Sequence, residues 1–277
     1  VKNIPSSVEL IEGCITNQNL VNSLMKRVDG CFHLAAIASV KRSNEQWLDT
    51  HKINCMASVN IFEAAARNKV PVAYASSAAV YGDLTELPLN EFCSPKPITA
   101  YGVDKYGCEL HAYVASTIHN LPTVGFRFFN VYGSRQNPDS PYSGVISIFA
   151  DKIKKGQALS IFGNGEQTRD FIYVKDVTRC LINSMEGINS GKAIQKVYNI
   201  CTNNETSINT LIIALENIFN KKSKKTYLPA RLGDIKYSCG DNKRILEDNL
   251  LETITALDQG LLEAVDTTKD IALQPII

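Results

Sequence analysis

The chain has 277 residues, of which 44% are hydrophobic and 21% are charged, and this composition excludes a disordered protein. The 29 lysines and arginines nearly balance the 28 aspartates and glutamates, so no excess of positive charge is present to bind nucleic acid or an anionic membrane surface. Because the apolar runs are also much shorter than the roughly 20 residues that span a bilayer, we expect neither nucleic acid nor a membrane as a partner.

Short apolar segments alternate along the chain with longer segments of helical periodicity, which is typical of a parallel β-sheet covered by helices on both faces. The sequence predicts strands at Val8 to Glu12, Gly30 to Leu34, Val70 to Ser76, Thr123 to Phe129 and Lys196 to Cys201. It predicts helices at Asn54 to Asn68, Tyr101 to Ile118, Gly144 to Lys155, Ile208 to Asn220 and Ala256 to Val265. The expected fold class is therefore α/β with a doubly wound parallel sheet.

A loop at residues 137–141, with the sequence Asn-Pro-Asp-Ser-Pro, divides the chain into two parts. We expect residues 1–130 to form the domain that contains the sheet, and residues 131–277 to form a smaller mixed domain from which a strand near residues 196–201 returns to the sheet. The first residues, Val-Lys-Asn-Ile-Pro-Ser-Ser, have neither a secretory leader nor an initiating Met, so we expect them to lie within a longer chain.

The eight cysteines are scattered without a Cys-x-x-Cys pair, and most of them lie in apolar contexts. This distribution is typical of buried free thiols in a reducing compartment, so we expect a cytoplasmic protein. The four histidines do not have the spacing of metal ligands, and we predict no metal site.

The strongest chemical signal is the segment Tyr101-Gly-Val-Asp-Lys105, because residues four apart in a helix lie on one face. An ammonium beside a phenol favours the phenolate, so the lysine is expected to lower the pKa of the tyrosine and make it a general base. A Tyr-x-x-x-Lys pair also occurs by chance, as an exposed tyrosine beside an exposed lysine. The surrounding segments therefore decide how much weight this pair carries.

Three of the predicted strands end in segments that suit a ligand site. One ends in the hydroxyls of Ser76 and Ser77, and another in His33-Leu34-Ala35-Ala36, whose small residues let a flat ligand approach the backbone. A third ends in the segment Arg127-Phe-Phe-Asn130. Because ligands of open parallel sheets bind outside the carboxyl ends of the strands, we expect these segments to meet at one crevice.

These segments, in this order, resemble the extended short-chain dehydrogenase/reductase family, and in particular its nucleotide-sugar 4-epimerases. The resemblance covers essentially the whole chain, since residues 127–133, Thr168-Arg-Asp-Phe-Ile172 and Arg231-x-Gly-Asp234 follow the serine strand and the Tyr-x-x-x-Lys pair as in the family. It implies a Rossmann-like sheet domain, tightly held NAD, a UDP-sugar substrate, and a homodimer formed by the helices at Asn54 to Asn68 and Tyr101 to Ile118.

The resemblance also implies roles for single residues. Tyr101 is the catalytic base, Lys105 orients it and the nicotinamide ribose, and Ser77 hydrogen-bonds the reacting sugar hydroxyl. The residues implied at the cofactor are Leu34, Ala35, Ala36, Asn54, Ala75, Tyr101, Lys105 and Phe128. The residues implied at the substrate are Ser77, Asn130, Val145, Phe162, Arg169, Arg231, Asp234 and Ser238. As alternatives, Arg169 pairs with Asp170 or Asp176, and Arg231 belongs to a plain turn.

The implied reaction inverts C4 of a UDP-hexose. Tyr101 removes the proton of the 4-hydroxyl while a hydride passes from C4 to NAD, and the 4-keto sugar then rotates and takes the hydride back on its other face. Family members that dehydrate or decarboxylate carry an acidic residue after the catalytic hydroxyl, whereas this chain has Ala78 and Ala79, which favours simple inversion. Ser238 lies where, in the family, a small residue accompanies N-acetylated hexoses.

The sequence departs from the family at its start, where members carry a Gly-x-x-Gly-x-x-Gly turn that holds the NAD pyrophosphate at a helix N-terminus. Val1 to Asn17 instead resembles the third strand of the family, so we expect the opening βαβ unit to be missing. Cys14 stands where the family usually has an aspartate that contacts adenine. The alternatives are an inactive remnant, a sugar-nucleotide-binding module, or another dehydratase or reductase of the family.

Overall fold

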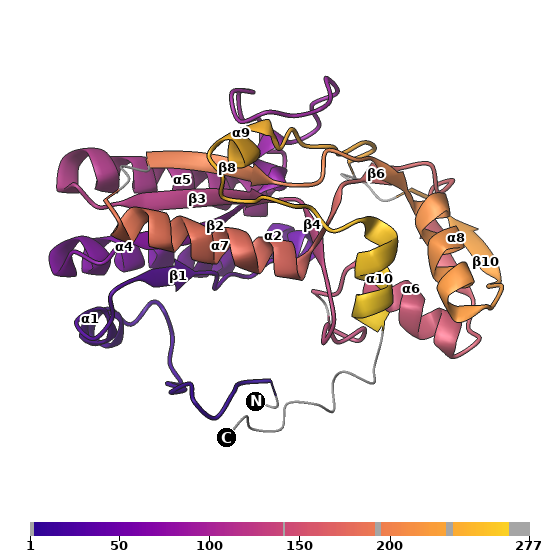
Figure 1. Cartoon of the computed structure of the whole chain (residues 1–277), viewed down its shortest axis with the longest axis horizontal. Coiled ribbons are helices and arrows are strands. Elements are labelled where there is room, and N and C mark those ends of the chain that lie inside the picture. The colour runs from indigo at the N-terminus through magenta and orange to yellow at the C-terminus, as the bar shows by residue number, and fades with distance from the viewer. Residues whose placement is uncertain (1–2, 141, 192–194, 231–234, 266–277) are drawn as a thin grey trace.

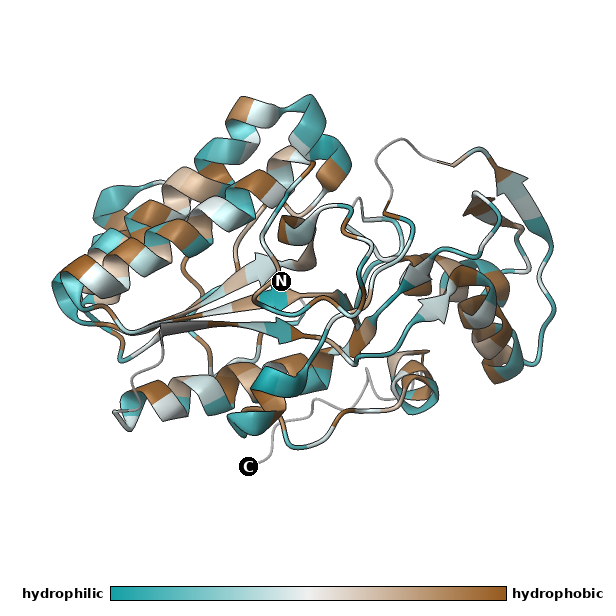
Figure 2. Ribbon diagram, turned by 90° about the horizontal axis from the view of Figure 1, so that it is seen from above, coloured by the Kyte–Doolittle hydropathy of each residue, from teal (hydrophilic) through white to brown (hydrophobic). Residues whose placement is uncertain are grey.

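The computed structural model describes residues 3–140, 142–191, 195–230 and 235–265 (Figure 1). Its central sheet has four parallel strands, and helices cover both of its faces (Figure 2). In spatial order the strands are β1 (Cys31–His33), β2 (Val72–Ser77), β3 (Thr123–Phe128) and β8 (Gln195–Ile200). The predicted α/β architecture is therefore confirmed, and β8 pairs with β3 along its whole length.

Two separate hydrophobic cores lie on the two faces of this sheet. One face is covered by α1 (Gln18–Met25), α4 (Ala57–Asn68) and α5 (Ala100–His119), and the other by α7 (Val174–Asn189) and α9 (Lys243–Glu247). Because side chains alternate along a strand, Val72 and Tyr74 of β2 pack with α4 and α5, whereas Ala73 between them packs with α7. Burial on both faces thus explains why the sequence of β2 is apolar without interruption from Val72 to Ala75.

A second lobe lies beyond the carboxyl end of β3, because β4 (Asn130–Tyr132) follows that strand directly (Figure 1). Its core joins α6 (Val145–Lys154), α8 (Ile208–Phe219) and α10 (Leu257–Val265). Three strand pairs complete it: β4 with β7 (Phe171–Tyr173), β5 (Leu159–Phe162) with β10 (Lys225–Leu228), and β6 (Thr168–Arg169) with β9 (Thr206–Ser207). The carboxyl ends of the sheet strands face the space between the two lobes. The domain boundary expected after residue 130 stays a prediction.

Short helical segments connect the strands of the sheet. They are α2 (Val40–Glu45), α3 (Trp47–His51), the π-helical η1 (Lys52–Met56) and the 3₁₀-helical η2 (Ala78–Tyr81). The helix predicted from Asn54 therefore begins as a π-helical turn, a feature that often accompanies functional sites. In the described part of the chain, no helix combines the length and apolarity that crossing a membrane requires.

The predicted strand from Val8 to Glu12 is wrong, since this segment is irregular and its apolar side chains Val8, Leu10 and Ile11 are exposed. A strand requires a neighbour that satisfies its backbone hydrogen bonds. No described strand pairs with this segment, and β1 is the edge of the described sheet. Apolar alternation alone therefore did not determine its structure.

A buried ion pair fixes α5 against the middle of the sheet. Arg127 of β3 donates from Nε and Nη2 to the two carboxylate oxygens of Glu109 in α5, at 2.9 and 2.7 Å, and both side chains are almost completely buried. Ser76 Oγ donates to the same carboxylate, and Arg127 Nη1 donates to Tyr81 Oη at 2.9 Å. Such a bidentate pair holds orientation as well as distance, so it sets how α5 lies on β2 and β3.

We predict that Arg127→Met lowers the free energy of unfolding by about 3 to 5 kcal/mol, because it leaves the Glu109 carboxylate buried without its partner. Arg27→Met is the matched control, since Arg27 pairs with Glu9 at 2.6 Å on the exposed surface. Its loss is expected to cost no more than about 1 kcal/mol. Urea unfolding of the three proteins measures the difference, and equal stability of the two variants would contradict this role for the buried pair.

Candidate active site

The chemistry predicted from sequence gathers where β2 ends and α5 begins. Ser77 is the last residue of β2, and Tyr101 lies in the first turn of α5, which Thr99 caps by accepting a hydrogen bond from the Gly102 amide at 3.1 Å. A Cβ at Gly102 would lie 2.5 Å from the carbonyl oxygen of Ala79, so glycine is required for the helix to approach η2 this closely. The approach brings the Tyr101 phenol into a hydrogen bond with Ser77.

Lys105 follows one helical turn after Tyr101 and points the same way. Its side chain is buried, and Nζ donates to the carbonyl oxygen of Ala75 at 2.8 Å and lies 5.9 Å from the centroid of the Tyr101 ring. Burial lowers the pKa of the Lys105 ammonium, while the nearby Cys108 and Asp104 raise it. The hydroxyl, phenol and amine named by the sequence therefore occupy one site.

The electrostatics of Tyr101 differ from the prediction that Lys105 lowers its pKa. Burial raises the pKa of Tyr101 above its ordinary value, and the hydrogen bond with Ser77 opposes this shift only in part. Lys105 is hydrogen-bonded to the Ala75 carbonyl and faces the ring of Tyr101. The prediction of an acidified phenol is therefore wrong for the chain by itself, because desolvation of the phenolate outweighs the hydrogen bond with Ser77.

A cavity of about 250 Å³ opens beside Ser77 between the two lobes. Five of the residues predicted from sequence line it, namely Ser77, Phe128, Asn130, Arg169 and Ser238. Its other lining residues are Val40, Ala78, Ala79, Gly82, Ile98, Thr99, Phe129 and Ile235. The cavity thus combines hydroxyl, amide and guanidinium groups with apolar walls, which suits a polar ligand held in a fixed orientation.

The remaining predicted substrate residues lie elsewhere. Val145 is the first residue of α6 and packs against the core of the second lobe, and Phe162 is the last residue of β5. Neither belongs to the lining of this cavity. Arg231 and Asp234 lie outside the described residues.

The aspartates considered as partners of Arg169 are engaged with other groups. Asp170 accepts hydrogen bonds from Thr202, Asn203 and Gly240, and Asp176 accepts hydrogen bonds from Arg179 and Thr255. Asp170 therefore joins the loops that bring Ser238 to the cavity wall.

A second cavity, of about 370 Å³, runs along β1 beside α1 and reaches the carboxyl end of that strand. Leu34 and Ala35 line it together with Cys14 and Ile15, and Ala36 follows directly in the chain. The small or apolar side chains at this end of the cavity fit the flat rings of a dinucleotide such as NAD. In the described residues, no group of three or more His, Cys, Asp or Glu side chains is suited to a metal ion.

Two residues predicted at the cofactor have structural partners instead of free polar atoms. Asn54 is buried, and its amide accepts from the Ile37 amide at 2.7 Å and donates to the Ile37 carbonyl at 3.1 Å. The Ala75 carbonyl accepts the hydrogen bond from Lys105. Asn54 therefore fixes the loop after β1, and Ala75 fixes the lysine.

Sequence reasoning missed the charged residues behind the site. Asp104 is buried and accepts a hydrogen bond at 2.6 Å from Nδ1 of His51, and its other carboxylate oxygen is buried with no hydrogen-bond partner among the described residues. Arg127 and Glu109 were also missed. The sequence does indicate that Arg127 is paired, because an arginine between two phenylalanines of a buried strand requires an acidic partner. The partner itself could not be identified from the sequence.

His33 supplies a test of this buried environment. Burial, aided by the positive charge of Lys105, lowers the pKa of His33 from 6.5 to about 4. The folded chain then binds fewer protons than the unfolded chain between these values, so stability is full above pH 6.5 and falls as the pH drops toward 4, by about 3 kcal/mol in total.

His33 Nε2 lies 2.8 Å from Ser58 Oγ. We predict that His33→Gln removes this part of the loss of stability at low pH, because the glutamine amide can still hydrogen-bond to Ser58 but does not titrate. Urea unfolding at pH 7 and pH 4.5 measures the effect. The exposed His119 gives the control variant His119→Gln, which should retain the wild-type pH dependence. Equal pH dependence of all three proteins would contradict the assignment.

The chain is similar in sequence to proteins of one enzyme family. The profile of the NAD dependent epimerase/dehydratase family matches residues 2–201. A putative UDP-glucose 4-epimerase from Methanocaldococcus jannaschii is 33% identical over 236 residues, which cover 84% of this chain and 75% of the relative.

Solved structures agree with these sequence matches. The UDP-glucose 4-epimerase of Thermotoga maritima with UDP-glucose is 30% identical, with a TM-score of 0.92 over 98% of this chain and 87% of that one. A UDP-glucuronic acid 4-epimerase from Bacillus cereus, in complex with UDP-glucuronic acid and NAD, is 29% identical, with a TM-score of 0.86 over 97% of this chain and 83% of that one.

Proposed function

The chain belongs to the NAD dependent epimerase/dehydratase family, and from this premise we propose that it inverts C4 of a UDP-hexose through a transient 4-keto sugar. The observation that carries the proposal is the Tyr101 phenol hydrogen-bonded to Ser77, with Lys105 one turn away. Of these groups, Ser77 lines the cavity to which Asn130 and Arg169 also belong. NAD is the cofactor of this family, and when bound it supplies the acceptor for the C4 hydride.

In this proposal the protein residues move the proton and hold the sugar. Ser77 hydrogen-bonds the 4-hydroxyl, and Tyr101 takes its proton and later returns it to the inverted alcohol. Lys105 holds Tyr101 and a ribose hydroxyl in place. Asn130 and Arg169 grip the diphosphate by fixed donors, so the hexose can rotate while the nucleotide stays bound. Val145, Phe162, Arg231 and Asp234 are proposed at the nucleotide end of the substrate.

The cavity wall favours an epimerase over a dehydratase. Elimination of water from the sugar requires an acid and a base near C5 and C6. The two residues after Ser77 are Ala78 and Ala79, which line the cavity and cannot transfer protons. Ser238 leaves space in the same wall, and we propose that the site accepts an N-acetylated hexose as well as a plain one.

We predict that Tyr101→Phe lowers kcat for the conversion of UDP-galactose to UDP-glucose by about 100 to 10,000-fold, the range of general-base catalysis. Binding of UDP, followed by calorimetry, should be unchanged. Tyr113→Phe is the matched control on the same helix, because its side chain is exposed, and it should keep full turnover. Full turnover by Tyr101→Phe would remove Tyr101 from its proposed role.

The same assay separates the alternatives. UDP-galactose and UDP-N-acetylgalactosamine are each supplied with NAD, and the products are identified by chromatography. A 4-epimer without free NADH supports the proposal, whereas loss of water or release of NADH indicates a dehydratase or reductase. UDP binding without turnover of either sugar indicates a sugar-nucleotide-binding module or an inactive remnant. A cytoplasmic location is also proposed, since all eight cysteines are free thiols.

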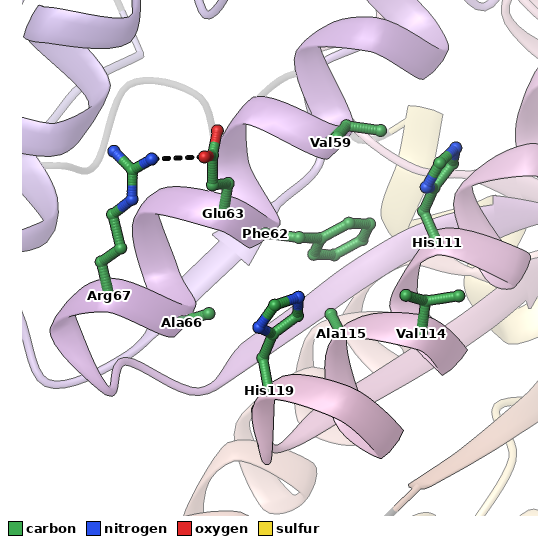
Figure 3. A pocket seen from close by; sticks show the side chains of 9 residues that line it. All are labelled: Val59, Phe62, Glu63, Ala66, Arg67, His111, Val114, Ala115 and His119. Atoms are coloured by element: carbon green, nitrogen blue, oxygen red, sulfur yellow. Dashed lines mark hydrogen bonds and ion pairs between the residues drawn. The ribbon is translucent and has the colours of Figure 1, made fainter.

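We also propose that the chain forms a homodimer through the outer faces of α4 and α5. A hollow between these helices is lined by Val59, Phe62, Ala66, Val114 and Ala115, with His111, His119 and the Glu63–Arg67 ion pair around it (Figure 3). Exposed apolar side chains are added by Val103, Leu110 and Ile118 of α5 and by Met56 at the end of η1, which leads into α4. So much exposed apolar surface is unusual for a monomer and suits a self-complementary interface.

We predict that Val114→Glu converts the dimer to a monomer, because it places a charge in the apolar centre of the proposed interface. Light scattering after gel filtration measures the mass. Leu262→Glu is the control, since Leu262 is similarly exposed but lies on α10 in the second lobe. A wild-type monomer, or a Val114→Glu dimer, would contradict the proposed interface.

A further inference from the structure

Two cysteines that the proposed reaction does not use lie together beneath the site. Cys108 is on α5, three residues after Lys105, and its Sγ lies 3.2 Å from the carbonyl oxygen of Asn54 in η1. Conversely, a Cβ at Gly107 of α5 would lie 3.1 Å from Sγ of Cys55 in η1. The Cys108 thiol thus contacts the residue that precedes Cys55, and the Cys55 sulfur lies next to Gly107, the residue that precedes Cys108.

The surroundings of this pair favour a thiolate on one of the two sulfurs. The hydrogen bond from Cys55 lowers the pKa of Cys108 to about 7, and the ammonium of Lys105 acts in the same direction against burial. In its protonated form the Cys108 thiol donates to the Asn54 carbonyl and to Ser58 Oγ. The same hydrogen bond raises the pKa of Cys55, which therefore keeps its proton. Asp104 is the acidic group that faces both thiols, and it partly opposes the thiolate.

A second pair of buried cysteines provides a contrast within the same chain. Cys201 and Cys239 lie near the carboxylate of Asp170, and a Cβ at Gly240 would lie 2.7 Å from Cys201 Sγ. Burial raises the pKa of both thiols, that of Cys239 to about 12, and Asp170 adds to the shift. Both pairs are buried, so the difference in thiol pKa follows the neighbouring charge, which is the Lys105 ammonium beside Cys108 and the Asp170 carboxylate beside Cys201 and Cys239.

We propose that Cys55 and Cys108 form a redox-sensitive dithiol, a modification site at which a hydroperoxide produces a disulfide between η1 and α5. The Cys108 thiolate attacks one peroxide oxygen, breaking the O–O bond and giving a sulfenic acid and hydroxide. The Cys55 sulfur then attacks the Cys108 sulfur and forms the S–S bond. The sulfenic oxygen leaves with the Cys55 proton, and the hydroxide is neutralised by the solvent, so both cysteines are oxidised while the peroxide is reduced to water.

The position of the disulfide links it to the cofactor side of the site. Asn54 precedes Cys55 and holds the loop after β1 through both atoms of its amide. Lys105 lies one turn before Cys108 on α5. A covalent link between the two segments would shift Asn54 and Lys105 relative to each other, so oxidation is expected to weaken NAD binding. This consequence, unlike the disulfide itself, rests on the proposed function.

The test treats the whole chain with hydrogen peroxide at pH 7.5 and maps disulfides by mass spectrometry after the remaining thiols have been blocked. The Cys55–Cys108 link is expected to form more than about tenfold faster than any Cys201–Cys239 link, because only the thiolate reacts. Cys55→Ala should leave a sulfenic acid on Cys108 that dimedone traps, and Cys108→Ala should abolish both products. Cys180→Ala, which removes a buried cysteine elsewhere, should react like the wild-type chain.

Each outcome decides a separate point. Failure of the Cys55–Cys108 link to form, or formation of both links at equal rates, would overturn the proposed dithiol. Calorimetry then compares NAD binding before oxidation, after oxidation and after reduction with dithiothreitol. A reversible loss of affinity supports the link to the cofactor site, and unchanged affinity overturns that link. A reduced chain that forms the disulfide readily but never binds NAD would count against the proposed function and leave the dithiol standing.

Discussion

The hydrogen-bonded ion pair between Arg127 and Glu109 is the constraint on which the site depends. It joins β3 to α5, and through Ser76 it also joins the end of β2, one residue before Ser77. Lys105 lies one turn before Glu109 on the same helix. Once this pair has formed, the orientation of α5 is set, and Tyr101 can reach Ser77 only because Gly102 allows close contact with η2.

Burial has opposite consequences for the two reactive groups of α5. It raises the pKa of Tyr101 and lowers that of Lys105, so desolvation favours the neutral form of each. The basicity that the proposed reaction requires of Tyr101 therefore depends on its hydrogen bond with Ser77 and on charge brought by bound molecules. The same lysine favours a thiolate at Cys108 and lowers the pKa of His33, so one buried cation acts on two further groups beside the site.

Three functions are proposed for different faces of one helix. Tyr101 and Lys105 face the strand ends, Cys108 faces η1, and Val114 lies on the outer face with Leu110 and Ile118. A helix of 20 residues can serve all three because its side chains turn by about 100° per residue. Changes at the proposed interface or at the thiols therefore act on the element that carries the proposed base.

The sequence by itself determined the four strands of the parallel sheet, the helices α4 and α5 on one face, and the convergence of Ser77, Tyr101 and Lys105, because helical spacing and strand ends are local patterns. It did not predict α7, which covers the other face. The tertiary structure decided what depends on distant partners. No described strand pairs with residues 8–12, and the side-chain amide of Asn54 is hydrogen-bonded to the backbone of Ile37. Burial reversed the predicted shift of the Tyr101 pKa. Desolvation and pairing are properties of the folded interior, and neither can be inferred from the spacing of residues along the chain.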